Sequence, residues 1–381
     1  MKSGLEDVVA AETVLSDVDG QAGRLVIRGH SLDDLVRRTS YEDVVKLLWT
    51  GFFVDLPEDL GRSLGRAREE VFEHLASADA DLFGQSSFDA VRAVLARLPD
   101  GNDLETALRL VAAPAVLTAG ILRLQRDLAP IAPDPTAGHA ADMLRMLHNR
   151  PPTPEQTYAL DRYLVTVSDH GLNASTFAAR VIASTRAGLT SATLAAMSAL
   201  KGPLHGGAPG PVLDMLDNIG TPELAGSWLQ KALERGERLM GFGHRVYRVR
   251  DPRADALREA IRVLVRAGQV DPERLHLAQV VEETALDLLA RRKPDRSLQT
   301  NVEFNTALLL EALGFPREAF TCVFAAGRAA GWIAHAREQL ATGRLIRPQS
   351  RYVGPQAQVP VASNASASGS ASVRSSGAPD R

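Results

Sequence analysis

The segment TPEQTYALDRYLVTV, residues 153–167, carries a full set of helix signals. Thr153 and Gln156 have the spacing of a capping box, in which each side chain accepts a hydrogen bond from the backbone of the other residue. Pro154 between them has the fixed φ that suits the first residue of a helix. The apolar residues that follow recur at helical spacing on one face: Leu160, Leu164 and Val167. We therefore predict a helix here with one buried face.

Similar signals recur along the chain. Thr221-Pro222 begins a second predicted helix, and Asp251-Pro252 begins a third that Gly268 is placed to end. Strand signals are scarce, and the clearest is RLVIR at residues 24–28 between two glycines, which predicts a short N-terminal hairpin. Aromatic residues make up only 5% of the chain. We predict an all-α protein with that hairpin as a minor β element.

The composition is that of an ordinary globular protein. Its 381 residues predict two or three structural units, and 45% of them are hydrophobic against 23% charged. Lys plus Arg number 43 and Asp plus Glu 46, for a net charge of −3. This balance argues against a dedicated nucleic-acid surface. The single cysteine, Cys322, excludes an intrachain disulfide and a metal site built on CxxC pairs.

Targeting signals are absent from the sequence. Acidic residues interrupt the first 20 residues, which contain no apolar stretch of signal-peptide length. The longest uncharged apolar run, residues 110–122, is 13 residues long and too short to span a bilayer. We expect a soluble, cytoplasmic protein without a membrane partner. From residue 355 we expect a disordered Ser/Ala-rich tail, since residues 361–381 include 7 serines and almost nothing to bury.

Several common catalytic motifs are also missing. The sequence contains no GxSxG elbow, no GxxxxGK[ST] phosphate loop and no HExxH, and Gly241-Phe-Gly243 lacks the third glycine of a dinucleotide fingerprint. The nine histidines do not show metal-ligand spacing. We predict no metal site.

Three histidines lie in polar or glycine-rich breaks between predicted helices: His170, His205 and His244. Glycine beside a histidine lets the backbone turn tightly and lets a ligand approach closely. Imidazole can donate or accept a hydrogen bond near neutral pH. Any one of them alone is more readily explained as a capping or loop histidine, but the three together favour a functional site.

Three arginines have a related placement. Arg253 follows the Asp251-Pro252 helix start, where its guanidinium and free backbone N–H groups can meet an anion. Arg328 lies in the small-residue segment AAGRAAG, residues 325–331, and Arg347 precedes Pro348. Taken singly, such arginines are usually solvated charges. As a set, their planar guanidinium groups suit a dicarboxylate.

Glu303 lies in QTNVEFN, residues 299–305, beside apolar neighbours. A carboxylate in such surroundings has a raised pKa and can act as a general base. An acid that caps a helix explains the local sequence equally well.

Taken together, these segments resemble the citrate synthase family over roughly residues 4–354. The likeness rests on motifs in the family's order: GLE at 4–6, Asp19-Gly20 before GRL at 23–25, DHGLNAST at 169–176, KGPLHGGA at 201–208, LMGFGHRVY at 239–247, DPR at 251–253 and NVE at 301–303. Each motif is weak alone, whereas the set in this order is highly specific.

The resemblance implies a two-domain, almost entirely helical fold. We expect a large domain from residues 1–209 and 319–354, a small domain from 210–318, and the tail from 355–381. It also implies a homodimer, and because the likeness begins at Gly4 we expect no N-terminal extension of the kind found in the hexameric, NADH-inhibited type.

The resemblance further implies an acyltransferase that converts acyl groups into alkyl groups on transfer, in the tricarboxylic acid cycle. Acetyl-CoA and oxaloacetate are its substrates, citryl-CoA its intermediate, and no cofactor is needed.

Site residues carry over one position at a time. His205 resembles the histidine that hydrogen-bonds the thioester carbonyl, Glu303 the base, and His244 the group that polarises the oxaloacetate ketone. The residues that resemble ligands of the oxaloacetate carboxylates are His170, Arg253, Arg328 and Arg347, the last reaching across the dimer. Arg248 resembles a contact to a CoA phosphate.

One residue departs from the family's pattern. Most members have aspartate in an Asn-Val-Asp segment where this chain has Glu303, which adds a methylene to the base. This departure leaves three functions open: citrate synthase, 2-methylcitrate synthase acting on propionyl-CoA, and a non-catalytic dicarboxylate or CoA sensor.

Overall fold

The computed structural model describes residues 4–5, 8–206, 209–243, 247, 249–293 and 298–355. Residues 1–346 form one compact unit, and 347–381 form a second unit. In the described part of the second unit, residues 347–355 contain no helix or strand, and the Tyr352 hydroxyl donates to the carbonyl of Pro355 at 2.8 Å. The rest of the predicted tail lies outside the described residues.

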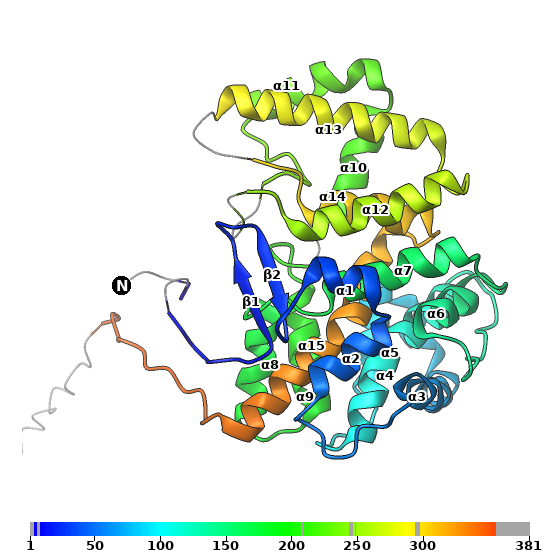
Figure 1. Cartoon of the computed structure of the whole chain (residues 1–381), viewed down its shortest axis with the longest axis vertical. Helices are drawn as coiled ribbons and strands as arrows, with labels where there is room; N and C mark the ends of the chain where they lie inside the picture. Colours follow the sequence, from blue (N-terminus) through cyan, green and yellow to red (C-terminus); the bar gives the residue numbers. More distant parts are fainter. Residues whose placement is uncertain are drawn as a thin grey trace, which may run out of the picture. The chain divides into compact units, whose positions relative to one another are not determined.

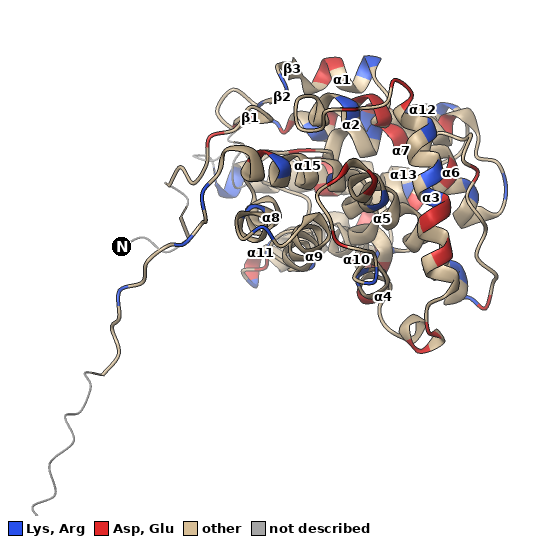
Figure 2. Cartoon of the chain, turned by 90° about the horizontal axis from the view of Figure 1, so that it is seen from below, with Lys and Arg blue, Asp and Glu red and all other residues tan. Residues whose placement is uncertain are grey.

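The described residues are mainly helical, which confirms the predicted fold class (Figure 1). The α-helices are α1 (Leu32–Arg38), α2 (Tyr41–Trp49), α3 (Leu60–Ala76), α4 (Ser87–Leu95), α5 (Leu104–Leu124), α6 (His139–His148), α7 (Pro154–Val167), α8 (Ala174–Ser184), α9 (Leu189–Leu200), α10 (Gly210–Ile219), α11 (Ala225–Glu234), α12 (Pro252–Arg266), α13 (Pro272–Arg292), α14 (Val302–Ala312) and α15 (Phe320–Thr342). Short 3-10 turns cover Ala80–Gly84, Pro222–Leu224 and Arg317–Ala319. Acidic and basic residues are interspersed over these helices (Figure 2).

The helix predicted from the capping box is α7. The Thr153 hydroxyl accepts a hydrogen bond from the Gln156 backbone N–H at 3.2 Å, and the Gln156 side chain accepts one from the Thr153 N–H at 3.1 Å. The predicted apolar face is buried: Leu160, Leu164 and Val167. Helix α12 likewise begins at Pro252 and ends before Gly268, which has a φ of +66°.

The second predicted helix starts differently. After Thr221 the chain makes a 3-10 turn, Pro222–Leu224, and α11 begins only at Ala225. The Thr221 side chain forms no cap hydrogen bond, so the signal marked the end of the loop rather than the first α-helical turn.

The predicted N-terminal hairpin is present. Strand β1 (Ser16–Asp19) pairs antiparallel with β2 (Arg24–Ile27), and a two-residue strand β3 (His30–Ser31) extends the sheet on the other side of β2. Leu25 and Ile27 are buried. This side of the hairpin therefore faces the protein core.

Helix α5 is longer than the uncharged run indicated. It has 21 residues because it extends past Arg109 and Arg123, the charges that flank the run. Among the described residues it is the one helix long and apolar enough to cross a membrane, yet 89% of its apolar stretch is buried inside the protein. It packs against α3, α4, α6 and α15, as a core helix does.

Helix α15 runs through the centre of the helical body (Figure 1). Small residues let neighbouring chain segments approach it closely: a Cβ on Gly327 would lie 2.4 Å from Val167 Cγ2, and one on Gly331 2.3 Å from the Ser168 carbonyl oxygen. The small-residue segment around Arg328 therefore brings this arginine against the end of α7. The division into two domains stays a prediction.

His139, the first residue of α6, gives the fold a specific acid sensitivity. Its side chain is fully buried, and neither ring nitrogen has a hydrogen-bond partner among the described residues. Burial, with a smaller effect of Arg68, lowers its pKa from 6.5 to about 3. Because the unfolded chain binds this proton more tightly, the stability that neutral His139 contributes is full above about pH 6.5 and is lost as the pH falls toward 3.

We expect His139→Phe to reduce the loss of stability in acid. Between about pH 7.5 and pH 5, the free energy of unfolding should fall by about 2 kcal/mol more in the wild type than in the variant, since the His139 contribution is about 1.36 kcal/mol for each pH unit below 6.5. Urea unfolding at about pH 7.5 and pH 5 measures this, with His276→Phe, at an exposed position on α13, as the control. An equal loss in the His139 variant and the wild type would contradict the assignment.

Candidate active site

A cavity of about 320 Å³ gathers five of the predicted site residues: His170, His205, Arg253, Glu303 and Arg328. They come from three helices and two loops that are distant in sequence. The cavity is also lined by residues 238–243 and by Tyr163, Val167 and Phe324. One site therefore contains two histidines, two buried arginines, the exposed Arg238 and a carboxylate.

His170 lies in the loop between α7 and α8. Its Nε2 atom is 3.1 Å from the hydroxyl of Tyr247, whose ring it meets edge-on with the centroids 5.6 Å apart. Gly171 has a φ of +60°, so the tight turn expected from glycine beside this histidine is present.

His205 is held through the hydroxyl of Ser175. Its Nε2 atom lies 2.8 Å from Ser175 Oγ, which also accepts a hydrogen bond from Trp332 Nε1 at 3.0 Å and lies 2.8 Å from Asn173 Oδ1. Burial lowers the pKa of His205 to about 4, and the positive charges of Arg328 and Arg253 contribute to that decrease. His205 is therefore neutral at neutral pH.

Arg253 forms a buried ion pair with Asp251. Its Nε and Nη2 atoms donate to the two carboxylate oxygens at 3.0 and 2.8 Å, and its backbone N–H donates to Oδ1 at 3.0 Å. Burial opposes the charged guanidinium, but Asp251 outweighs it and raises the pKa of Arg253. The guanidinium and the backbone N–H of Arg253, which we predicted to meet an anion, thus both contact the Asp251 carboxylate in the structure. This contact holds Arg253 beside the cavity.

Arg328 carries the second buried positive charge. Only 1% of its surface is exposed, its Nε atom donates to the carbonyl of Val167, and its Cζ atom lies 5.0 Å from the centroid of the Phe324 ring. Burial lowers the pKa of this guanidinium to about 10, opposed by Asp169, so it remains protonated at neutral pH. Two buried cations bordering one cavity favour an anionic ligand.

Glu303 lies in the first turn of α14, but the cap of that helix is Asn301, whose side chain accepts a hydrogen bond from the Glu303 N–H at 3.1 Å. The Glu303 Oε2 atom is buried and has no hydrogen-bond partner among the described residues. Burial raises the pKa of this carboxyl, and Arg253 opposes the increase. The geometry favours the general-base interpretation over the helix-cap interpretation.

Three predicted residues are not placed in this cavity. His244 and Arg248 lie outside the described residues, and Arg347 belongs to the second unit. The chain just before His244 is well held: Gly243 N donates to the Gln299 carbonyl at 2.8 Å, and Asn301 Nδ2 donates to the Gly243 carbonyl at 2.9 Å. These bonds tie the segment that leads to His244 to the cap of the Glu303 helix.

Sequence reasoning missed several residues that complete the site. Ser175 and Asp251 lie within the motifs quoted above, so their positions in those motifs could have identified them as site residues. The sequence contains no signal for two others. These are Trp332, which is 157 residues from Ser175, and Tyr163, which lines the cavity. Their contribution depends on how the helices pack.

Comparison with known proteins shows the family to which this chain belongs. Residues 4–349 match the family described as citrate synthase, C-terminal domain. The chain belongs to the citrate synthase family. It is a citrate synthase-type transferase, as the resemblance implied.

The relatives of this chain include proteins named for each of the two enzymatic activities that the resemblance left open. The chain is 37% identical to citrate synthase of Haloferax volcanii over 376 residues, covering 93% of this chain and 96% of the relative. It is 36% identical to 2-methylcitrate synthase of Mycobacterium tuberculosis over 374 residues, covering 94% and 92%.

Solved structures of the citrate synthase family share the fold. Citrate synthase from Thermotoga maritima matches with a TM-score of 0.81 at 33% identity, covering 94% of this chain and 97% of that one. The ternary complex of carboxymethyl coenzyme A and oxaloacetate with citrate synthase from Thermoplasma acidophilum matches with a TM-score of 0.82 at 27% identity, covering 95% and 99%.

Proposed function

We propose that this enzyme condenses acetyl-CoA with oxaloacetate and water to give citrate and CoA. The observation that carries the proposal is the cavity itself, in which Glu303, whose buried Oε2 atom has no hydrogen-bond partner among the described residues, lies with a neutral histidine and two buried arginines. The reaction needs each of these groups. It uses no metal or cofactor, and we place it in the cytoplasm, in the tricarboxylic acid cycle.

The first step in the proposal is proton removal. Glu303 takes a proton from the methyl group of acetyl-CoA while His205 donates a hydrogen bond to the thioester oxygen, on which negative charge develops. Neutral His205 has one N–H. The proposal takes the tautomer with the proton on Nδ1, which leaves Nδ1–H for the thioester; Nε2 then accepts from the Ser175 hydroxyl, which otherwise donates to Asn173 Oδ1 at 2.8 Å.

The second step forms the carbon–carbon bond. The enolate carbon attacks the ketone carbon of oxaloacetate, whose carboxylates contact His170, Arg253, Arg328 and Arg347. The ketone π electrons move to the oxygen that His244 polarises, and this oxygen takes up a proton to become the hydroxyl of citryl-CoA. Water then cleaves the thioester of citryl-CoA and releases CoA, with Arg248 holding a CoA phosphate during the reaction. Holding both reactants in attack geometry can lower the barrier by about 7–11 kcal/mol.

The chief alternative is 2-methylcitrate synthesis from propionyl-CoA. One additional methylene in an apolar pocket changes binding by only about 1–3 kcal/mol, so one cavity can accept both acyl groups. We place three residues at the acyl end of the site: Glu303, which replaces the family's usual aspartate, and Phe304 and Asn305 after it. They can therefore affect which acyl group the enzyme prefers. A non-catalytic dicarboxylate or CoA sensor is the third possibility.

Thiol release from the purified protein with oxaloacetate, comparing acetyl-CoA with propionyl-CoA, tests these functions. A higher kcat/KM with acetyl-CoA supports citrate synthase, and a higher kcat/KM with propionyl-CoA supports 2-methylcitrate synthase. No thiol release from folded protein that still binds oxaloacetate supports the sensor.

Arg347 tests the proposed homodimer. Loss of a charge-assisted hydrogen bond costs about 1.5–3 kcal/mol, so we expect Arg347→Ala to weaken oxaloacetate binding about 10- to 100-fold. If the arginine acts across the interface, a mixed dimer of Arg347→Ala and Glu303→Gln subunits has one complete site and regains activity. Mixed dimers as inactive as either parent would place Arg347 in its own subunit's site.

A further inference from the structure

The base of the N-terminal hairpin contacts the loop that carries His170. Ser16, the first residue of β1, uses one hydroxyl group to bridge the residues on either side of this histidine. Its Oγ–H donates to Asp169 Oδ2, and its Oγ accepts the Gly171 N–H at 2.9 Å. His170 lies between these two attachment points.

The orientation of the Ser16 hydroxyl follows from its partners. Asp169 is fully buried, and although burial raises its pKa, His335, Ser16 and Arg328 lower it below the ordinary value, so the side chain is a carboxylate and accepts only. The Gly171 N–H can only donate. Ser16 must therefore give its proton to Asp169 and accept from Gly171, which satisfies both groups at once.

Asp169 is also held from the opposite side. His335 Nε2 lies 3.2 Å from Asp169 Oδ1, and Arg180 Nε donates to His335 Nδ1 at 3.1 Å. Because the arginine can only donate, Nδ1 is the acceptor and Nε2 carries the proton that faces Asp169. The His170 loop is thus fixed to α8 and α15 on one side and to the hairpin, through Ser16, on the other.

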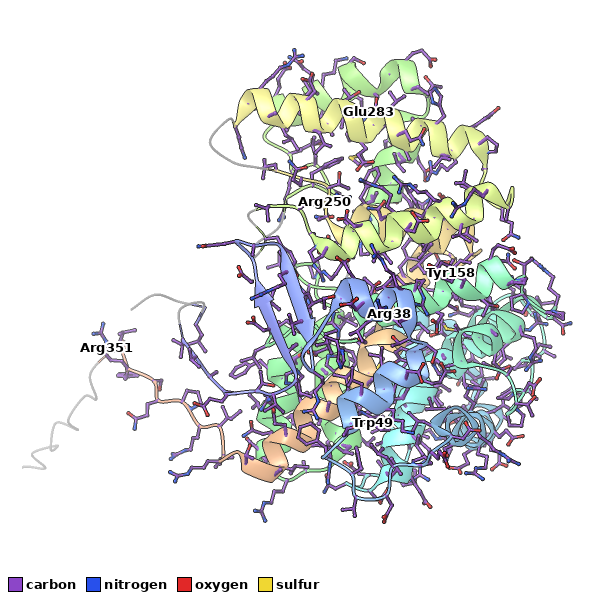
Figure 3. The ribbon with its side chains drawn as sticks, in the orientation of Figure 1. Arg38, Trp49, Tyr158, Arg250, Glu283 and Arg351 are labelled. Carbon is purple, nitrogen blue, oxygen red and sulfur yellow. The ribbon has the colours of Figure 1, made fainter. Side chains whose placement is uncertain are left out.

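The other end of the hairpin contacts a second part of the site. At the turn between β1 and β2, a Cβ on Gly23 would lie 2.8 Å from Val249 Cγ2 and 2.9 Å from the Arg250 carbonyl oxygen. Arg250 lies beside the hairpin in Figure 3. This segment leads directly into the Asp251–Arg253 ion pair. The hairpin therefore connects the His170 loop with the start of α12.

We propose that Ser16 is a positioning residue for His170 and that, through this residue, the N-terminal hairpin sets the affinity of the site for the dicarboxylate substrate. The inference rests on the proposed function, which makes His170 a ligand of oxaloacetate. Ser16 itself lines no part of the cavity given above, so its effect is transmitted through Asp169 and Gly171.

The test compares three variants of the full chain. Ser16→Ala removes both hydrogen bonds, and Ser16→Thr keeps a hydroxyl. Ser31→Ala is the matched control, because the Ser31 hydroxyl caps α1 at the other side of the same sheet by accepting from the Asp34 N–H at 3.1 Å. Calorimetry gives the Kd for oxaloacetate, thiol release gives kcat and the KM of each substrate, and thermal unfolding gives Tm.

Loss of the bridge leaves two buried groups with one partner fewer, so we expect Ser16→Ala to raise the Kd and KM for oxaloacetate about tenfold while the KM for acyl-CoA stays within twofold. Ser16→Thr should restore most of the affinity. Ser31→Ala should lower Tm and leave the Kd for oxaloacetate unchanged. If general loss of hairpin stability weakened binding, Ser31→Ala would raise the Kd as well.

An oxaloacetate Kd within twofold of wild type for Ser16→Ala would overturn the inference, as would an equal increase for Ser31→Ala. A wild-type protein that binds oxaloacetate without releasing thiol would overturn the proposed catalysis and still allow the Kd comparison to decide the role of Ser16. Wild-type protein that does not bind oxaloacetate would overturn both.

Discussion

Replacing Glu303 by glutamine should lower kcat about 10³-fold, within the range for loss of a general base. The amide has nearly the same size but does not accept the methyl proton, and the buried Oε2 atom has no hydrogen-bond partner among the described residues. Oxaloacetate affinity should stay largely intact, because Arg253 and Arg328 are unchanged. Thiol release and calorimetry with oxaloacetate measure the two quantities.

Glu311→Gln is the matched control for this variant. Glu311 lies on the same helix, α14, where its carboxylate accepts hydrogen bonds from Arg274 at 2.9 and 3.0 Å, away from the cavity. Its turnover should equal that of the wild type. Unchanged turnover in Glu303→Gln would exclude this residue from the role of base. It would also remove the argument for the sensor, which rests on Glu303 replacing the family's usual aspartate.

Replacing His205 by alanine should lower kcat about 10²- to 10³-fold, the usual cost of losing one hydrogen bond to a developing oxyanion. The KM for oxaloacetate should change little, because the role assigned to His205 concerns the thioester. Since burial lowers the pKa of His205 to about 4, its neutral form persists across the neutral range, and wild-type kcat should show no loss between about pH 6 and 7 from this group. Steady-state thiol release over that range measures both effects.

Two further variants decide how His205 works. Ser175→Ala removes the hydroxyl that contacts Nε2 and should reproduce part of the His205→Ala loss, whereas His276→Ala on the exposed surface of α13 should have no effect. If His205→Ala retains wild-type kcat, the thioester contact must come from another group. A kcat that falls as the pH rises through about 6.5 would instead show that the charged imidazolium is the active form.

The sequence predicted those parts of the fold whose causes are local. The capping box of Thr153 and Gln156, the prolines at the starts of helices, and the glycine after α12 act between residues a few positions apart, so their pattern is visible in one segment. The 3-10 turn after Thr221 and the full length of α5 were missed at element ends. There, local preference is weak and the packing of neighbouring helices determines where the helix stops.

The candidate site divides in the same way. The motifs supplied its residue types, including Glu303 and the arginines, because each motif is a short run of adjacent residues. Only the tertiary structure brings His170, His205, Arg253, Glu303 and Arg328 to one cavity, and only there do the Asp251–Arg253 ion pair and the Ser175 contact with Trp332 appear together.

The charge states of these groups also depend on tertiary structure. Burial and two neighbouring guanidinium groups make His205 neutral, and burial raises the pKa of Glu303. Such shifts come from the removal of water and from charges on other helices, which no segment of sequence contains. The amino-acid sequence thus specifies the helical class and the chemical groups available, whereas the packing of α7, α14 and α15 sets where those groups meet and which of them carry a charge.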